Sequence, residues 1–497
     1  MHAFVSCHMH RLIPSVAPAA INAATPRSVV GVADDSQRLS QRSNKAVVTA
    51  RAAVPNRGGR AVSGDVMVEG SRSDNGSLAR TTDGERSQQR PCTPPELAVA
   101  PDAVINLELG DPTMYEAFWK EAGERTAVVI PGWRGMSYFS DAGGLCWFLE
   151  PEFEREVRRL HRLVGNAAVD GYHLVVGTGA TQLSQAAIYA LSPADANHPI
   201  GVVSPAPYYS AYAPQTDLLL SGFYRWAGDA NAMGGDSHIE LVCSPNNPDG
   251  AIREAVLSSK PGKAIHDLVY YWPQYTPITG TAAHDIMLFT MSKITGHAGT
   301  RLGWALVKDL EVAKKMTYFV DRSTIGVSRD SQLRAAKILT LVSDAYDDDK
   351  DTRRLFDFAQ RCMADRWQAL RATVASTGMF SLPEETSGYC TFTKQIVPAY
   401  PAFAWLRCEK ESVENCRELL RGHGVLAQGG ELFGGDARLD SFDLCYSSIV
   451  VVDPTGLSTT TSRLSTIIRC MHIERFPVFF SVFYDSELLV PSGEQLH

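Results

Sequence analysis

The chain has 497 residues, of which 44% are hydrophobic and 21% are charged. At roughly 100 to 200 residues per domain, this length predicts two or three folded units with enough apolar surface for a core. The 47 basic and 55 acidic side chains give a net charge of -8. This balance excludes a strongly basic protein that binds nucleic acid through its overall charge.

The ten cysteines are scattered along the chain and never form a Cys-x-x-Cys pair. This spacing excludes a zinc module and a disulfide scaffold, and it suits a reducing compartment. We therefore predict a cytoplasmic protein with no metal site. No apolar run approaches the roughly 18 residues that a membrane span needs, so we predict no membrane contact.

Residues 1–100 are rich in Ser, Arg, Ala, Asn and Gly and show no period that could bury a face. We predict that they are disordered. The first 60 residues hold eight Lys or Arg side chains and only two acids, Asp34 and Asp35. Plastid and mitochondrial transit peptides share this balance, so a plastid location is the alternative to a cytoplasmic one.

The sequence becomes globular from Val104 onward. Residues 104–107 favour a strand, residues 152–164 an amphipathic helix, and residues 173–176 an apolar strand that leads through a Gly-rich turn, 177–182, into a helix. Short strands that end at polar residues recur at 200–203, 239–243, 264–266, 285–290 and 303–307. This alternation predicts an α/β domain with a mostly parallel sheet and a ligand at the carboxyl ends of its strands.

A second part of the chain has a different pattern. Residues 309–373 favour helices, and residues 380–392 and 402–407 look like strands of a smaller α+β domain. After about residue 438 the sequence pattern changes again, and the residues show no clear helical period. The predicted boundaries are 1–100 disordered, 101–150 N-terminal part of the small domain and dimer arm, 151–345 large domain, 346–437 small domain and 438–497 atypical tail.

The Gly-rich turn 177–182 is the first candidate binding element. Its sixth position is Gln182, not the third glycine of a dinucleotide fingerprint, and it lacks the Gly-Lys-Ser/Thr end of a Walker A loop. The backbone N-H groups of Ala180 and Thr181 remain available to hold one phosphate at a helix N-terminus. A plain helix cap would show the same residues.

Two further clusters follow predicted strands. Asp267 ends an apolar strand, where a carboxylate can hold a proton on a heteroaromatic nitrogen, and Tyr270 could reach a neighbouring hydroxyl. The alternative is an Asp that caps the next helix. Lys293 follows another strand and, if partly desolvated, would be a nucleophilic amine. Glycines downstream would let Thr290 and Arg301 converge on a phosphate, although most lone lysines are surface charges.

Joined in chain order, these pieces resemble a pyridoxal-phosphate (PLP) enzyme of the aspartate aminotransferase fold. The matching residues are Asn247-Pro248, Asp267 to Tyr270, Thr290 to Lys293, and Arg301. The resemblance implies fold type I, in which a large domain with a mostly parallel seven-stranded sheet adjoins a smaller α+β domain.

The match is strongest to the plant alliinase and tryptophan aminotransferase family, over about residues 104–438. It rests on the motifs Gly110 to Thr113, Met136 to Ser140, Leu145 to Pro151, Val164 to Ala167, Ser244 to Gly250, Tyr270 to Pro273 and Ser292 to Gly299. The tryptophan aminotransferase branch, which makes indole-3-pyruvate for auxin synthesis, is the more similar one. Alliinases carry an additional Cys-rich EGF-like segment, and residues 1–103 show none, which favours transamination over carbon-sulfur lysis.

The resemblance assigns roles around the cofactor ring. Lys293 would form the Schiff base with PLP, and Asp267 would pair with the pyridine nitrogen. Asn247 and Tyr270 would bind the ring hydroxyl, and Tyr209 would stack on the ring.

The resemblance also assigns the phosphate contacts, to Ala180, Thr181, Thr290 and Arg301. In a homodimer of this fold, Tyr138 would reach the phosphate in the neighbouring subunit. Where the family usually has Ser or Thr, this chain has Ala180. A hydroxyl contact worth about 0.5 to 1.5 kcal/mol is therefore lost.

The chain departs from the family after the turn Phe433 to Asp436. Members normally continue into a strand reading roughly Val-Arg-Leu-Ser, whose arginine binds the substrate carboxylate as a bidentate pair. In this chain the residues after Asp436 do not follow that pattern. Arg438 and Arg463 are the two conceivable replacements for the arginine. A frameshifted or intron-derived tail, or an alternative gene product, would explain the change. Loss of the arginine predicts substrate binding weaker by several kcal/mol.

The predicted function is therefore a PLP-dependent aminotransferase, active on an aromatic L-amino acid. The resemblance implies conversion of L-tryptophan to indole-3-pyruvate, with pyruvate or 2-oxoglutarate as amino acceptor. One alternative is an alliinase-type carbon-sulfur lyase. Another is a catalytically impaired family member that binds PLP and dimerises but lacks the carboxylate-binding arginine.

Overall fold

The computed structural model describes residues 104–434, except 109, 195–196, 234–237, 258–262, 349–350 and 410–414, together with the backbone of strand 446–450. The predicted disordered segment 1–100 lies outside the described residues. So do Arg438, Arg463 and the tail beyond residue 450.

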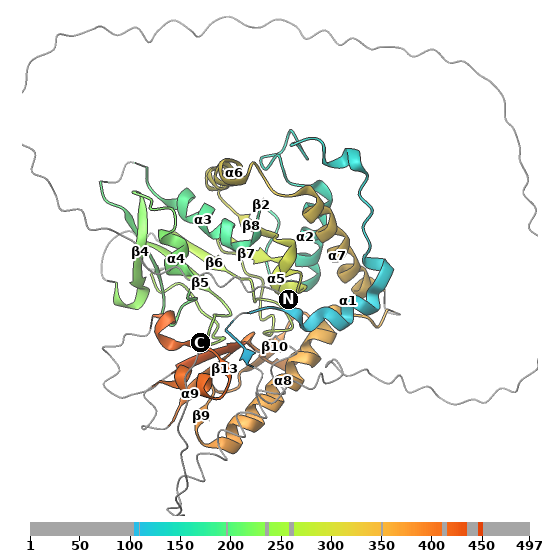
Figure 1. Cartoon of the computed structure of the whole chain (residues 1–497). Coiled ribbons are helices and arrows are strands. Elements are labelled where there is room, and N and C mark those ends of the chain that lie inside the picture. The colour runs from blue at the N-terminus through green and yellow to red at the C-terminus, as the bar shows by residue number, and fades with distance from the viewer. Residues whose placement is uncertain are drawn as a thin grey trace, which may run out of the picture. The chain divides into compact units, whose positions relative to one another are not determined.

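A seven-stranded sheet forms the centre of the described part of the chain (Figure 1). Its order is β2 (His173–Gly177), β8 (Gly303–Val307), β7 (Ile286–Thr290), β6 (Lys263–Asp267), β5 (His238–Cys243), β3 (Ile200–Ser204) and β4 (Tyr224–Asp229). The strands from β4 to β7 are parallel to one another. Only β8 runs antiparallel to its neighbours β2 and β7. The predicted mostly parallel, seven-stranded sheet is confirmed.

Six of these strands agree with the predicted ones to within a residue or two. The edge strand β4 was not predicted, because only Tyr224 in it is buried and its sequence therefore lacks an apolar run. Every residue of the central strand β7 is buried, as expected for a strand covered on both faces.

Helices surround this sheet. They are α2 (Pro151–Val164), α3 (Gly179–Leu191), α4 (Tyr212–Asp217), α5 (Met291–Ile294), α6 (Leu310–Thr324) and α7 (Arg329–Asp347). Helix α3 packs against α6, and α2 packs against α7 (Figure 1). The buried residues of α2, Phe153, Val157, Leu160 and Val164, recur at helical spacing, which explains why the sequence predicted this helix.

The remaining elements lie in the predicted segments 101–150 and 346–437, apart from β15, which lies in the predicted atypical tail 438–497. They are β1 (Ile105–Asn106), α1 (Glu116–Ala122), α8 (Leu355–Thr377), β9 (Phe380–Ser381), β10 (Ser387–Cys390), β11 (Gln395–Pro398), β12 (Phe403–Cys408), α9 (Cys416–Gly422), β13 (Val425–Leu426), β14 (Gln428–Gly429) and β15 (Tyr446–Val450). Strand β1 pairs with β13, so residues 105–106 lie beside residues 425–426.

Strand β15 changes the interpretation of the C-terminal region. It pairs antiparallel with β12 and with β14 in a four-stranded sheet of order β14-β15-β12-β9. A strand therefore follows the turn at Phe433, as in the family pattern, although the sequence Tyr-Ser-Ser-Ile-Val holds no arginine.

Among the described residues, no helix has both the length and the apolar character needed to span a bilayer. The described cysteines, Cys146, Cys243, Cys362, Cys390, Cys408 and Cys416, are buried.

Candidate active site

A cavity of about 360 Å³ opens at the carboxyl ends of β5, β6 and β7. Its wall includes nine of the ten predicted site residues: Ala180, Thr181, Tyr209, Asn247, Asp267, Tyr270, Thr290, Lys293 and Arg301. This is the edge of the sheet where ligands bind in open α/β folds. The structure thus brings together residues that are spread over more than a hundred positions of the sequence.

Asp267 is the last residue of β6. Its Oδ2 accepts a hydrogen bond of 2.9 Å from the Tyr212 hydroxyl, whereas its buried Oδ1 has no partner. Burial raises the pKa of this carboxyl from 3.8 to about 6, although the Tyr212 hydrogen bond and the Lys293 charge lower it. A buried acceptor without a donor is costly, so Oδ1 is suited to a ligand that brings an N-H group.

Lys293 lies in the short helix α5, which begins directly after β7. The Thr290 side chain caps this helix by accepting a hydrogen bond from the Ser292 backbone N-H. Burial lowers the pKa of Lys293 from 10.5 to about 8, and the Arg301 charge lowers it further, while Asp267 opposes the shift. About a tenth of this amine is therefore uncharged at pH 7 and able to act as a nucleophile, far more than at the ordinary pKa of a lysine.

Hydrogen bonds from two other side chains hold the backbone around Lys293 in place. The Tyr275 hydroxyl donates to the Lys293 carbonyl at 2.9 Å, and the Trp119 indole donates to the Thr295 carbonyl at 2.8 Å. These donors satisfy carbonyl groups at the end of α5 that have no partner within the helix. The lysine side chain is thereby held in a defined position relative to the strand ends.

The N-terminus of α3 and Arg301 form the predicted anion site. Gly179 has φ of 77°, a left-handed value that favours glycine, and a Cβ atom there would lie only 2.9 Å from Arg301 Nη2. The guanidinium therefore lies against the turn that exposes the first N-H groups of α3. This arrangement can bind a phosphate through a charge and a helix N-terminus together.

Tyrosines line the rest of the cavity. The Lys293 amine lies 5.6 Å from the centre of the Tyr270 ring, and Tyr209 meets Tyr212 edge-on at 5.3 Å between ring centres. Burial raises the pKa of the Tyr270 hydroxyl well above 10, and the Asn247 side chain opposes this shift. Tyr270 is therefore a neutral hydrogen-bond donor at neutral pH.

The tenth predicted residue, Tyr138, does not line this cavity and is 72% exposed. Conversely, sequence reasoning missed Tyr212, which contacts Asp267 directly. The tyrosine lies 55 residues upstream in a short helix, and no local pattern marks it. Phe403 and Gln428, from the small-domain strands, also line the cavity and were not predicted.

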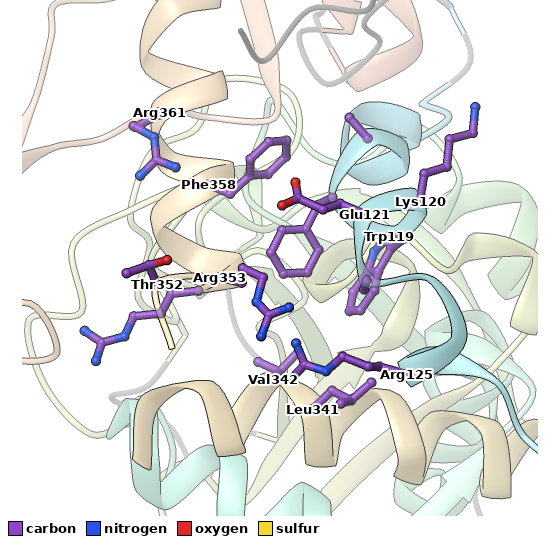
Figure 2. Close-up of a pocket in the computed structure, with 14 residues that line it drawn as sticks. Trp119, Lys120, Glu121, Arg125, Leu341, Val342, Thr352, Arg353, Phe358 and Arg361 are labelled. Atoms are coloured by element: carbon purple, nitrogen blue, oxygen red, sulfur yellow. The ribbon is translucent and has the colours of Figure 1, made fainter. Parts of the chain in front are cut away.

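A larger cavity, of about 600 Å³, lies between α1, α7 and α8 (Figure 2). Aromatic and arginine side chains line it, including Phe358 and Arg361. Arg125 and Arg353 there both pair with Asp351, at 3.3 and 2.9 Å. None of the predicted site residues reaches this cavity, so the chemistry belongs to the smaller one.

Comparison with known families gives a match that spans most of the described residues. The model of the family described as allinase covers residues 105–448. This range extends ten residues past Arg438, where we expected the resemblance to end, and it includes the beginning of β15. The expectation that nothing after Arg438 resembles the family is therefore wrong for residues 439–448.

Named relatives belong to both branches of that family. Tryptophan aminotransferase-related protein 1 of Oryza sativa subsp. japonica is 64% identical over 69% of this chain and 79% of its own length. Tryptophan aminotransferase-related protein 2 of Arabidopsis thaliana is 53% identical over 67% of this chain and 76% of its own length. Alliin lyase of Allium cepa var. aggregatum is 38% identical over 72% of this chain and 83% of its own length.

Solved structures agree on the fold. An aspartate aminotransferase from Thermotoga maritima has a TM-score of 0.51 and 17% identity, over 74% of this chain and 92% of that one. An alanine aminotransferase from Pyrococcus furiosus has a TM-score of 0.52 and 17% identity, over the same shares. With the family match, these findings show that the chain is a member of the alliinase family with an aspartate aminotransferase-like fold.

Proposed function

We propose that this chain is a PLP-dependent aminotransferase that converts L-tryptophan to indole-3-pyruvate, with pyruvate or 2-oxoglutarate as amino acceptor. The observation that carries the proposal is the pairing of Asp267 and Lys293 in one cavity. A carboxylate with an unpartnered buried oxygen and an amine of lowered pKa line the same small space.

The described residues fit PLP. Asp267 Oδ1, which lacks a donor, would accept the N-H of the pyridine ring. The N-terminus of α3, with Arg301 and Thr290, would hold the phosphate, and Asn247 with Tyr270 would hold the ring hydroxyl. The cavity of about 360 Å³ is within the range of small-molecule sites.

When bound, PLP supplies an aldehyde that captures the substrate amino group and a protonated ring that withdraws electrons from the Cα-H bond. Asp267 maintains that protonation by keeping a negative charge at the ring nitrogen. Lys293 would hold the aldehyde of the bound cofactor and would act as the base that moves a proton from the substrate Cα. Its pKa of about 8 suits both directions of this transfer near neutral pH.

The choice of an aromatic substrate is supported by the wall of the cavity and by the relatives. Tyr209, Val269 and Phe403 add apolar and aromatic surface beside Lys293. The rice and Arabidopsis relatives are named as tryptophan aminotransferase-related proteins. A second candidate, carbon-sulfur lysis, is favoured by the 38% identity to alliin lyase.

We also propose that the chain acts in the cytoplasm as a homodimer in which Tyr138 reaches the phosphate site of the second copy. The segment around Tyr138 supports this arrangement, because Trp133, Met136 and Phe139 are 70%, 83% and 56% exposed. Large apolar side chains gathered on one exposed segment are typical of an interface.

Strand β15 supports a third possibility, an impaired member of the family. The strand occupies a place in the small-domain sheet, yet its sequence contains no arginine for the substrate carboxylate. We therefore expect the chain to bind PLP more effectively than it transaminates.

Purified protein supplied with PLP tests these functions directly. Tryptophan and pyruvate should yield indole-3-pyruvate, and an S-alkyl-cysteine sulfoxide should yield little pyruvate. The reverse pattern would assign the lyase reaction. Bound cofactor without turnover of either substrate would assign the impaired state, and the variant Lys293→Ala is the control for reactions that do not use the site.

A further inference from the structure

Outside the active site, one cluster of metal-ligating side chains occurs among the described residues. It consists of Glu254, His266 and His284, whose ligand atoms all lie within 4.8 Å of one another. His266 belongs to β6 and is only 6% exposed. Glu254 and His284 lie in the loops that follow β5 and precede β7, where they are exposed and partly buried.

The topology of the sheet brings these three residues together. His266 of β6 pairs in register with Met287 of β7. His284 lies three residues before Met287, so the loop that contains His284 passes beside His266. The loop with Glu254 is anchored nearby, because Glu240 of β5 accepts hydrogen bonds from the backbone N-H groups of Val256 and Leu257 at 2.8 and 3.0 Å. The cluster is therefore built on fixed backbone.

The buried histidine has an unsatisfied nitrogen. Nδ1 of His266 is buried and has no hydrogen-bond partner. Its ring is stacked on that of His284, with 3.5 Å between the centres and 7° between the planes. Stacking accounts for the packing of two rings, but it leaves the buried nitrogen without a donor or acceptor, which costs free energy.

The donor set suits a transition metal. His266 and His284 each offer an imidazole nitrogen, which is a common ligand of transition metals. Glu254 adds a carboxylate, which completes the two-His, one-carboxylate set found in many zinc and iron sites.

The ligand atoms are close enough to share one ion after the side chains rotate. They all lie within 4.8 Å of one another, and two nitrogen ligands at about 2.0 to 2.1 Å from a tetrahedral ion lie about 3.3 Å apart. An imidazole lone pair lies in the plane of its ring, so the two rings must turn from parallel to share one ion. His284, in a loop and only partly buried, is the residue that can turn.

We propose that Glu254, His266 and His284 bind one divalent transition-metal ion, with Zn²⁺ as the expected occupant. The ion would hold the two loops against β6 and would therefore have a structural role. Side chains alternate along a strand, so His266 faces away from the cavity that Asp267 enters. The site is thus separate from the proposed PLP site, and this inference does not rest on the proposed function.

Calorimetric titration of the metal-depleted, PLP-loaded protein with Zn²⁺ tests the site. We expect one ion per chain and a higher melting temperature with zinc. Glu254→Gln and His284→Gln should each weaken binding at least roughly tenfold, a loss that even outer-shell residues cause, and should abolish the thermal shift. His198→Gln, which changes an exposed histidine elsewhere, should leave both unchanged.

Two results would overturn the proposal. One is the absence of stoichiometric zinc binding to the wild-type protein. The other is zinc binding that Glu254→Gln and His284→Gln leave intact, because the ion would then lie elsewhere. Both substitutions are in loops and have polar replacements of similar size, and far-UV circular dichroism verifies that the variants fold.

Discussion

The two sides of the active-site cavity differ in how completely they match the family. On the large-domain side, Asp267, Lys293, Arg301 and the N-terminus of α3 converge on one space of about 360 Å³. On the small-domain side, the described strand after the turn at Phe433 is β15, and its five residues, Tyr, Ser, Ser, Ile and Val, include no arginine. Among the described residues, the proposed cofactor half is therefore complete, whereas β15 offers the substrate half no arginine.

The two sides of the cavity are carried by different sheets. Asp267 ends β6 and Lys293 follows β7, so the packing of the seven-stranded sheet fixes the positions of both residues. The carboxylate-binding side depends on β15, which pairs only with the small-domain strands β12 and β14. A change in the C-terminal segment can therefore alter substrate binding without disturbing the cofactor site.

The largest expected effect comes from removal of the Lys293 amine. Lys293→Ala should lower transamination roughly 10³-fold or more, because it removes both the nucleophile and the base. The visible absorbance that arises when PLP joins the amine should disappear as well. Lys308→Ala, on an exposed lysine, is the matched control. Retention of the absorbance in Lys293→Ala would show that PLP joins a different amine.

Restoring the arginine tests whether its absence weakens substrate binding. Replacement of the segment after Arg438 by a Val-Arg-Leu-Ser strand of the family should lower the KM for tryptophan by a factor that corresponds to about 2 to 5 kcal/mol. The affinity for PLP should change little. Steady-state kinetics of both proteins measure the effect, and a wild-type KM already equal to that of the graft would show that another group binds the carboxylate.

The pH dependence of stability tests the environment of Asp267. Its pKa is about 6 in the folded, cofactor-free protein and 3.8 as the ordinary value. Between these pH values the unfolded chain binds fewer protons at this group, so its contribution to stability is lost as the pH rises from about 4 to 6. The shift corresponds to roughly 3 kcal/mol.

Asp267→Asn should therefore gain free energy of unfolding relative to the wild type over that interval, as measured by urea unfolding of the cofactor-free proteins. An equal difference at pH 4 and pH 6 would contradict a raised pKa. Asp285→Asn, at an exposed carboxylate, serves as the control.

The smallest effect concerns the phosphate site. Ala180→Ser supplies the hydroxyl that most family members have at this position, and one neutral hydrogen bond is worth about 0.5 to 1.5 kcal/mol. The affinity for PLP should therefore increase by a factor of about two to ten. Fluorescence titration with PLP measures it. A decrease in affinity would place the phosphate away from the N-terminus of α3.

Sequence reasoning predicts the large-domain half well for a physical reason. Asp267 and Lys293 each follow a short apolar strand, and parallel strands of one sheet end at the same edge. The local sequence pattern therefore predicts that Asp267 and Lys293 lie close together. Tyr212 shows the limit of this argument, since it reaches Asp267 from a six-residue helix 55 positions away.

Two other features lay beyond prediction for similar reasons. Strand β15 has only five residues and is defined by its partners β12 and β14, so its own sequence carries little signal. Glu254, His266 and His284 lie 12 and 18 positions apart without the regular spacing of a known metal motif, and only the register of β6 and β7 brings the histidines together. Both depend on tertiary pairing.

The central claim is that the Lys293 amine joins PLP beside Asp267. Borohydride reduction of the PLP-loaded protein, followed by proteolysis and mass spectrometry, tests it most directly. We predict that the phosphopyridoxyl group is found on the peptide that contains Lys293 and on no other peptide in stoichiometric amount. Its attachment to a different lysine, or its absence from a protein that retains its fold, would contradict the account.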